Sequence, residues 1–463
     1  MKKILGYAFL CLFVLMVQQA LAQDQSIDKA RQERENTDSL TKVDYEHLLN
    51  MLHITLPVLP AEQQDPKRPK DAVPRKNEDG YTDAEGHSLK RTQWGDWINY
   101  NESKANNYVL SNPLVLNNGK KVTSVSMWWK KRRPEIVHDY ETEVFGRVPK
   151  NTPKVKFEVT SIDSTANDGK AIKEVIVGHI NNAQFPEAKP SIQMVLYLPK
   201  DRLEPVPLMV IASSNTAGHG QTIKLINNAG WGAAIFSTNA VQADNGAGLT
   251  RGIIGLINKG KPRAPQDWGV LRAWSWGLSR ALDYFVFNKA INSKAIGIEG
   301  HSRWGKTALL AGAMDPRWAI VFASCSGSGG ASLEKRNYGE NIGILAGETE
   351  YHWFAPNFVK YGGSWDKLPV DAHEMISLVA PRPIFITGGD EDIWADPLGE
   401  FKACVAATPV YQLLGKQGIQ VSKMPAPDVS LIKGDLAFRE HKGGHTDSLD
   451  WPIFIEFAKR YLK

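Results

Sequence analysis

Cysteine is scarce in this chain. The 463 residues include only three, Cys11, Cys325 and Cys404. Cys11 lies in an N-terminal segment that we expect to be removed, and two cysteines are too few for a disulfide framework. We therefore expect Cys325 and Cys404 to be buried thiols, with a single disulfide between them as the alternative.

The chain also lacks an excess of charge of one sign. The formal net charge is +5 at pH 7, and charged residues make up 23% of the chain. This balance argues against nucleic acid as the main partner. A basic cluster over residues 130–133 is typical of a solvated edge, and a polyanion site is the alternative.

Long hydrophobic runs are missing except at the N-terminus. Lys2 and Lys3 precede a mostly apolar stretch over residues 4–17, and residues 20–22 read ALA before Gln23. These are the features of a secretory signal peptide, and we expect residues 1–22 to be cleaved. Elsewhere the sequence does not approach the roughly 20 apolar residues of a membrane span. We expect a secreted or periplasmic protein without a membrane anchor.

Apolar periodicity is weak in the region that follows the signal. Residues 23–100 are rich in Gln, Asp, Glu and Lys, and residues 61–90 show almost no apolar repeat. We interpret this region as an extended N-terminal arm that packs on a larger domain over residues 101–463. A short helix is expected near residues 45–52.

Within residues 101–463, short apolar runs alternate with segments of helical spacing. This alternation predicts an α/β fold, a three-layer sandwich with a mostly parallel central sheet, and places the functional site at the carboxyl ends of the strands. Strands are expected near residues 155–159, 192–198, 208–212, 233–236, 296–299, 319–324 and 383–387, and helices after Arg133-Pro134, after a cap at Asp267 and near residues 305–314, 398–414 and 452–462.

A serine lies between glycines at one of the predicted strand-to-helix junctions. Residues 300–306 read GHSRWGK, which resembles the G-x-S-x-G turn that lifts a nucleophilic serine above a sheet. Here the second glycine comes one residue late. Ser302 is the predicted nucleophile, and an incidental serine in an ordinary turn is the alternative.

A nucleophilic serine needs a general base and an acid that orients it. Residues 441–447 read HKGGHTD just before the last predicted helix, and His445, which follows the paired glycines, is the predicted base. His441, His445 and Asp447 could instead bind a metal from one helix. The glycines at residues 443 and 444 argue against such a helix.

The acid is expected in the loop after the strand at residues 383–387. Residues 388–397 read GGDEDIWADP, and Asp392 is the preferred acid because it lies three residues beyond the second glycine. Asp390 and Glu391 remain alternatives. Asp396, directly before a proline, has the pattern of a helix N-cap.

Four ordered segments resemble the signatures of glucuronoyl esterases, the fifteenth family of carbohydrate esterases. They read GHSRWGK at 300–306, SGSGG at 326–330, DIWADP at 392–397 and GGH at 443–445. The resemblance implies an α/β-hydrolase fold without metal or organic cofactor. It also implies hydrolysis of the ester between (4-O-methyl-)glucuronic acid side chains of glucuronoxylan and lignin alcohols. We expect a monomer.

The resemblance assigns roles to individual residues. Ser302 would be the nucleophile and His445 the base, Arg303 would stabilise the oxyanion, and Lys306 and Trp394 would contact the sugar. A guanidinium beside the nucleophile suits this chemistry, because the negative charge on the carbonyl oxygen develops only in the transition state.

The sequence departs from the fungal members at two positions. Fungal members have the triad glutamate where this chain has Cys325, so the resemblance moves the acid to Asp392. They have a disulfide-forming cysteine where this chain has His301. Glu350 is a candidate for substrate binding, with a surface carboxylate as the alternative.

Two other functions remain open from the sequence. The first is a carbohydrate esterase of different specificity, such as an acetyl-xylan esterase. The second is a non-catalytic protein with the same fold that binds polysaccharide through some of its 14 tryptophans. The complete set of serine, histidine and acid weighs against the second.

Overall fold

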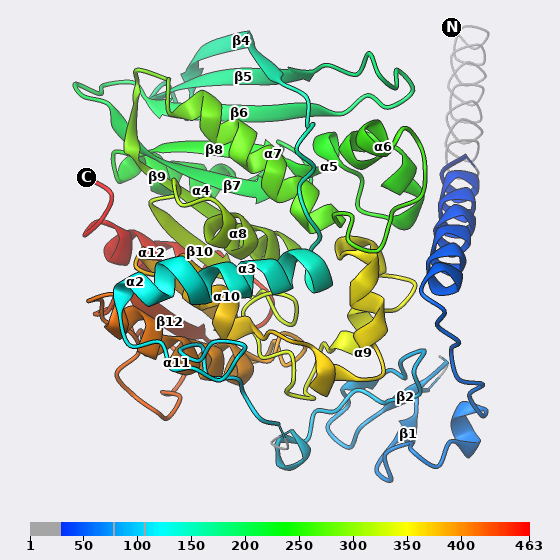
Figure 1. Ribbon diagram of the computed structural model, residues 1–463. Helices are drawn as coiled ribbons and strands as arrows, with labels where there is room; N and C mark the ends of the chain where they lie inside the picture. Colours follow the sequence, from blue (N-terminus) through cyan, green and yellow to red (C-terminus); the bar gives the residue numbers. More distant parts are fainter. Residues whose placement is uncertain (1–28, 77–78, 106–107) are drawn as a thin grey trace, which may run out of the picture.

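A large mixed sheet forms the centre of the computed structural model, which describes residues 29–76, 79–105 and 108–463 (Figure 1). The strand order across this sheet is β12-β11-β10-β9-β7-β8-β6-β5-β4. The first six strands in this order pair in parallel, and β6, β5 and β4 continue the sheet in antiparallel pairing. The mostly parallel sheet predicted from the sequence is confirmed.

The strands of this sheet have the following bounds: β4 (Val155–Ala166), β5 (Ala171–Ile180), β6 (Ser191–Pro199), β7 (Val206–Ser213), β8 (Gly232–Ser237), β9 (Ile291–His301), β10 (Ile320–Ser324), β11 (Ile384–Gly389) and β12 (Leu436–His441).

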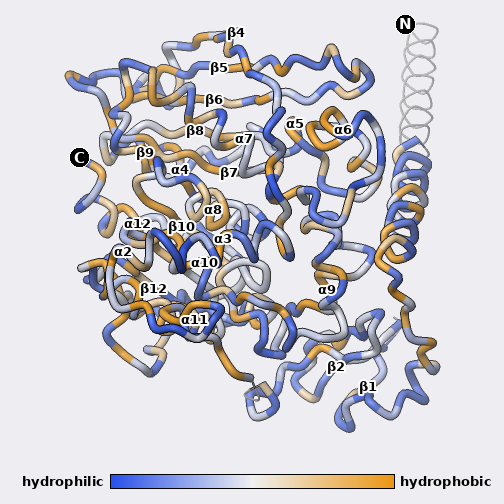
Figure 2. The backbone as a smooth tube through the Cα atoms, in the orientation of Figure 1, coloured by the Kyte–Doolittle hydropathy of each residue, from blue (hydrophilic) through white to orange (hydrophobic). Residues whose placement is uncertain are grey.

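Strands in the middle of the sheet are buried on both faces. In β10, Val321 and Ala323 belong to the larger hydrophobic core, whereas Ile320 and Phe322 belong to a second core on the opposite face. Successive side chains of a strand point to opposite faces, so a continuous apolar run supplies both cores. Hydrophobic residues are concentrated in this central region, whereas the N-terminal helix contains many hydrophilic residues (Figure 2).

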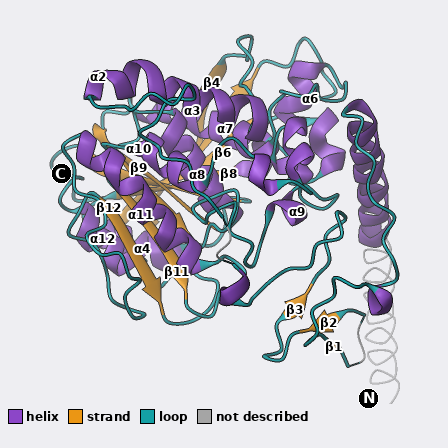
Figure 3. Ribbon diagram, turned by 60° about the horizontal axis from the view of Figure 1, so that its bottom comes forward, coloured by secondary structure: helices purple, strands orange, loops and turns teal. Residues whose placement is uncertain are grey.

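Helices form the two outer layers (Figure 3). α4 (Gly220–Asn228) and α12 (Trp451–Ala458) contribute to the second core. The larger core receives α7 (Val270–Phe285), α8 (Arg303–Met314), α10 (Ala372–Val379) and α11 (Pro397–Leu413). The shorter helices are α2 (Val125–Met127), α3 (Arg133–Asp139), α5 (Thr238–Val241), α6 (Gly252–Asn258) and α9 (Ile342–Leu345). π-helical turns at Trp128–Arg132 and Tyr140–Val144 flank α3.

Some predicted elements needed correction. The cap of α7 is Gly269, whereas the Asp267 side chain accepts hydrogen bonds from Asn258 and the Ala264 N–H. The last helix ends at Ala458 rather than near residue 462. β5, β12, α4 and α10 were not predicted.

The basic cluster at residues 130–133 is not simply a solvated edge. Arg132 is buried and donates to the Glu374 carboxylate at 2.6 Å. Arg133 donates to the carbonyl of Ala313 at 2.7 Å. Lys130 and Lys131 remain exposed. Half of the cluster therefore joins elements of the fold.

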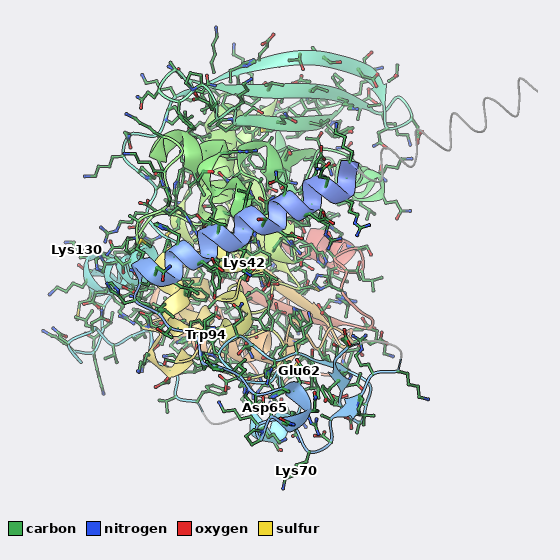
Figure 4. All side chains as sticks on the ribbon, turned by 90° about the vertical axis from the view of Figure 1, so that its right-hand side faces the viewer. Lys42, Glu62, Asp65, Lys70, Trp94 and Lys130 are labelled. Atoms are coloured by element: carbon green, nitrogen blue, oxygen red, sulfur yellow. The ribbon has the colours of Figure 1, made fainter. Side chains whose placement is uncertain are left out.

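The N-terminal region lies against the α/β sandwich. Within the described residues a helix covers residues 29–51, much longer than the predicted segment, and crosses one side of the molecule (Figure 4). Its buried residues Tyr45, Leu48 and Leu49 join the larger core. A small antiparallel sheet follows, formed by β1 (Val73–Pro74), β2 (Tyr81–Thr82) and β3 (Ser88–Leu89).

The predicted signal peptide at residues 1–22 lies outside the described residues. Across the described ranges, every helix is too short or too polar to cross a membrane. Cys325 and Cys404 are both buried free thiols, as predicted.

Candidate active site

The predicted serine turn joins β9 to α8. Ser302 directly follows His301, the last residue of β9, and precedes Arg303, the first residue of α8. Its backbone has φ 60° and ψ −129°, a positive φ that is uncommon for a residue with a side chain. Backbone strain of this kind is often found at functional sites. In this conformation Ser302 is partly exposed just beyond the carboxyl end of the strand.

Two glycines permit the tight approach of this strand and helix. A Cβ at Gly300 would lie 2.0 Å from the Trp304 carbonyl oxygen. A Cβ at Gly305 would lie 2.8 Å from the Ser324 carbonyl oxygen on β10. Both contacts are shorter than real side chains adopt, so the late position of the second glycine still serves the packing of helix against strand.

His445 and Asp392 form a hydrogen-bonded pair beyond the neighbouring strands. His445 Nδ1 lies 2.6 Å from Asp392 Oδ2. Asp392 follows β11 and His445 follows β12, and these strands pair in parallel, with Gly389 opposite His441. Asp392 is buried, whereas 43% of the His445 side chain is exposed. A buried carboxylate on Nδ1 leaves Nε2 as the nitrogen available for proton transfer.

The other acids of this loop have different partners. Asp390 accepts a hydrogen bond from the Gly443 N–H at 2.8 Å. The side chain of Glu391 is exposed. Asp396 caps α11 by accepting from the Gly399 N–H at 3.0 Å, as predicted. Of the three candidate acids, Asp392 is the one whose carboxylate contacts His445.

Two further side chains stand beside the pair. The rings of His301 and His445 have centroids 4.3 Å apart, which brings His445 next to the residue that precedes Ser302. Burial and the neighbouring His445 lower the pKa of His301 to about 4, so its ring is neutral at pH 7. Cys325 follows β10, and burial raises the pKa of its thiol. The segments that follow the parallel strands β9, β10, β11 and β12 thus carry Ser302, Cys325, Asp392 and His445.

Arg303 is fixed at the entrance of α8. Its Nη1 donates to Asp244 Oδ2 at 2.8 Å, and its guanidinium lies 5.0 Å from the ring centroid of Trp353. Asp244 also accepts from Trp353 Nε1 at 2.6 Å and contacts His352 Nε2 at 3.0 Å. Burial favours the neutral form of Asp244, but the contacts with His352, Trp353 and Arg303 together outweigh it and lower the pKa to about 2.

Lys306 is buried one turn further along α8, with 4% of its side chain exposed. Its ammonium donates at 2.6 Å to the carbonyls of Ser326 and Ser328 and to the carboxylate of Glu340. An ammonium has three donors, and these acceptors occupy all of them. Direct contact of Lys306 with a sugar stays a prediction, and it requires exchange of one of these bonds.

The remaining predicted substrate residues lie close by. Trp394 is partly buried, and Lys90 of the N-terminal region lies 4.8 Å from its ring centroid. Glu350 Oε2 is buried without a hydrogen-bond partner in the described part of the chain. Burial and the nearby Glu340 raise the pKa of Glu350 to about 8, so its carboxyl is not an ordinary surface carboxylate.

The structure brings together two sets of side chains with the composition of metal ligands, as judged over the described residues. One set is Cys325, Asp392 and His445, and the other is Asp83, Glu85 and His87. The sequence-based metal alternative of His441, His445 and Asp447 is not among them. His441 instead contacts Asp450 and the Gly444 carbonyl.

Comparison with known proteins decides the family. The model described as glucuronyl esterase, fungi, matches residues 183–415. Carbohydrate esterase MZ0003, from an unknown prokaryotic organism, is 33% identical over 79% of this chain and 92% of its own. The 4-O-methyl-glucuronoyl methylesterase 1 of Wolfiporia cocos is 30% identical over 67% of this chain and 73% of its own. A CE15 glucuronoyl esterase structure from Teredinibacter turnerae has a TM-score of 0.79 at 36% identity, covering 91% of this chain and 99% of its own.

This chain belongs to the glucuronoyl esterase family. It is therefore a carboxylic ester hydrolase with an α/β-hydrolase fold, and the family predicted from the sequence is confirmed.

Sequence reasoning missed two carboxylates of this glucuronoyl esterase. Glu340 accepts from Lys306, and its N–H donates to the Trp394 carbonyl at 2.8 Å, so it connects two predicted substrate residues. Asp244 fixes Arg303. Neither residue stands in a motif. The signal that could have indicated Glu340 is the lysine one helical turn after Ser302, since a buried cation needs a carboxylate partner. The side chain of Arg303 is 41% exposed, so the same argument does not extend to Asp244.

The N-terminal helix of the esterase reaches the same network. Asp44 accepts a hydrogen bond from Tyr351 Oη at 2.8 Å, and Thr41 Oγ1 accepts from the Ala247 N–H at 3.1 Å. Tyr351 immediately precedes His352, and Ala247 lies three residues after Asp244. The helix thus contacts both segments that surround Arg303.

Proposed function

We propose that this esterase hydrolyses the ester between (4-O-methyl-)glucuronic acid side chains of glucuronoxylan and lignin alcohols, through an acyl-enzyme on Ser302. The observation that carries the proposal is the His445–Asp392 pair at 2.6 Å. The two residues lie in the loops that follow β12 and β11, at the same edge of the sheet as the strained serine turn after β9. Family membership supports a glucuronate ester as the substrate.

Acylation begins with attack by Ser302 Oγ on the ester carbonyl carbon. His445 Nε2 takes the hydroxyl proton as the new C–O bond forms, and the carboxylate of Asp392 stabilises the resulting imidazolium. The tetrahedral intermediate then expels the alcohol, whose oxygen receives the proton from His445. The products of this half-reaction are the free alcohol and a glucuronoyl ester on Ser302.

Deacylation reverses these roles with water. His445 removes a proton from the attacking water and returns it to Ser302 Oγ as the ester bond breaks. Glucuronic acid leaves and ionises to glucuronate.

Arg303 is the proposed oxyanion-stabilising residue. Arg303 directly follows Ser302 in the chain and its guanidinium is fixed by Asp244, so little reorganisation is needed when negative charge develops on the carbonyl oxygen. Trp394 offers an apolar surface to the sugar ring, and Glu350 and Lys306 are proposed to contact its hydroxyls. Glu340 orients Lys306 for that contact.

The proposed organisation of the chain follows the same reasoning. Residues 1–22 are a signal peptide that exports the protein to the periplasm or the medium, where glucuronoxylan is accessible. Residues 23–100 form an arm on a catalytic domain over residues 101–463. The mature protein acts as a monomer.

The test measures hydrolysis of benzyl glucuronate, acetylated xylan and p-nitrophenyl acetate by the wild-type protein. We expect the highest kcat/KM on benzyl glucuronate. Activity on acetyl esters alone would overturn the proposed substrate, and inactivity on all three would favour a polysaccharide-binding protein.

Variants test the proposed roles in the same assays. Ser302→Ala should abolish turnover. Arg303→Ala should lower kcat about 100-fold to 1,000-fold with little change in KM, the usual effect of losing one oxyanion donor. Wild-type turnover in Arg303→Ala would refute the oxyanion role.

A further inference from the structure

A second histidine–aspartate pair lies behind the proposed catalytic pair. His441 is the last residue of β12, and Asp450 directly precedes α12. Both side chains are fully buried, and His441 Nδ1 lies 2.9 Å from Asp450 Oδ2. His441 stands only four residues before His445, so the pair is placed to act on the loop that carries the proposed base.

Both ring nitrogens of His441 face hydrogen-bond acceptors. Nδ1 faces the Asp450 carboxylate, and Nε2 lies 3.0 Å from the carbonyl oxygen of Gly444. Neither oxygen can donate, so both nitrogens must carry protons for both bonds to exist. His441 is therefore a buried imidazolium in this geometry.

Charged and titratable groups from several elements surround His441. Asp450 also accepts from Arg439 on β12. Glu440 on the same strand has a pKa raised to about 7 by burial and by Asp390. His301 on β9 is neutral, as described above. Burial disfavours the charged form of His441, but Asp450 and the Gly444 carbonyl outweigh burial and Arg439, and its pKa is raised.

The Gly444 carbonyl belongs to the peptide unit that leads into His445. The same loop is joined to the acid loop, because the Glu391 N–H donates to the Gly443 carbonyl at 3.0 Å. A Cβ at Gly389 would lie 2.4 Å and 2.5 Å from the carbonyl oxygens of Gly443 and Gly444. The two loops that carry the proposed base and acid are therefore packed backbone against backbone, with His441 beneath them.

We propose that His441 is a positioning residue: its imidazolium holds the Gly444 carbonyl and thereby sets the place of His445 relative to Ser302. The inference rests on the proposed role of His445 as the base. When His441 loses its proton, an Nε2 lone pair faces the carbonyl oxygen and the contact becomes repulsive. A raised pKa means that the contact is present below that pKa and lost as the pH rises through it.

The consequence is an alkaline limb in the pH profile of kcat that belongs to His441. In His441→Gln the amide N–H donors sit on a single nitrogen. The glutamine therefore cannot donate to both the Asp450 carboxylate and the Gly444 carbonyl, as the two ring nitrogens of His441 do. On the pH plateau below the alkaline limb, we expect the kcat of this variant to fall about 100-fold, in line with an error of about 1 Å in a catalytic group, with KM within about twofold of wild type. Asp450→Asn keeps an acceptor but removes the charge, so its alkaline limb should move to lower pH.

A matched control separates positioning from a loss of stability. His373 on α10 is also fully buried and contacts the Ser111 carbonyl at 2.9 Å through Nε2. His373→Gln should lower the melting temperature but leave the alkaline limb of kcat unchanged. Wild-type kcat in folded His441→Gln, or an unmoved alkaline limb in Asp450→Asn, would overturn the proposal.

The protonation state has a direct readout. In ¹⁵N-histidine-labelled wild-type protein, the signals that disappear in His441→Gln should show both ring nitrogens protonated at pH 6, and a neutral tautomer at that pH would overturn the inference. Rates are measured on p-nitrophenyl acetate beside benzyl glucuronate. If the substrate assignment is incorrect, the wild-type protein will have poor activity on benzyl glucuronate but not on p-nitrophenyl acetate. The rates of the variants on p-nitrophenyl acetate then still test the role of His441.

Discussion

His445 Nδ1 lies 2.6 Å from Asp392 Oδ2, and the carboxylate in this contact is buried while the ring is partly exposed. A buried carboxylate on one nitrogen fixes both the tautomer and the direction of the ring. Of the three candidate acids in this loop, Asp390, Glu391 and Asp392, this contact identifies Asp392 as the partner of His445.

Replacement of the acid tests this pair. Asp392→Asn leaves the size of the side chain unchanged but favours the wrong tautomer of His445, so we expect kcat on benzyl glucuronate to fall about 10,000-fold, as for comparable triads. Glu391→Gln, one residue away on an exposed side chain, is the control and should stay within about twofold of wild type. A Glu391 variant as slow as Asp392→Asn would refute the assignment.

Cys325 offers a second position for the acid. Its Sγ belongs to a set with ligand atoms of Asp392 and His445 that all lie within 4.8 Å of one another. A glutamate at position 325 is expected to reach the same imidazole. The double variant Asp392→Asn with Cys325→Glu should therefore have a kcat at least about tenfold higher than that of Asp392→Asn alone. Cys325→Gln in the same background controls for volume. Equal rates in the two double variants would show that position 325 cannot supply the acid.

The sequence predicted those parts of the site that depend on backbone geometry. The serine turn was recognisable because Gly300 and Gly305 are required by contacts of strand with helix. Asp392 was preferred by its spacing, and the structure brings its carboxylate to His445. Both features arise within a few residues of one strand end, where local sequence decides the turn.

The partners of the cations could not be predicted in this way. Glu340 is separated from Lys306 by 34 residues, and Asp244 from Arg303 by 59 residues. Only the tertiary fold brings such groups together, and a single carboxylate on a loop carries no periodic signal. β12 was missed for a related reason. Its apolar run stops after three residues at Phe438, and the next side chain, Arg439, donates to Asp450 rather than packing in the core.

Loss of the Lys306 ammonium should destabilise the fold. Lys306→Met would leave Glu340 as an unpaired buried carboxylate beside two carbonyls, and removing one partner of a buried ion pair costs about 3 to 5 kcal/mol. We expect a smaller loss in the double variant Lys306→Met with Glu340→Gln, because no charge is then left unpaired. Chemical denaturation measures both, with Lys335→Met as the partly exposed control. Unchanged stability in Lys306→Met together with a raised KM would show that the ammonium serves the substrate rather than the fold.

Glu350 should make stability depend on pH. Burial and Glu340 raise its pKa in the folded protein to about 8, against an ordinary value of 4.5. The folded state therefore binds more protons than the unfolded state between these values, and the stabilisation that this group provides is complete below pH 4.5 and is lost as the pH rises through about 8. Glu350→Gln cannot ionise, so its free energy of unfolding should fall less between pH 5 and pH 8 than that of wild type. Glu348→Gln, on the neighbouring carboxylate, is the control and should follow the wild-type curve in urea denaturation. Parallel curves for wild type and Glu350→Gln would mean that Glu350 ionises normally in the folded protein, and its proposed contact with sugar hydroxyls would then be that of an ordinary carboxylate.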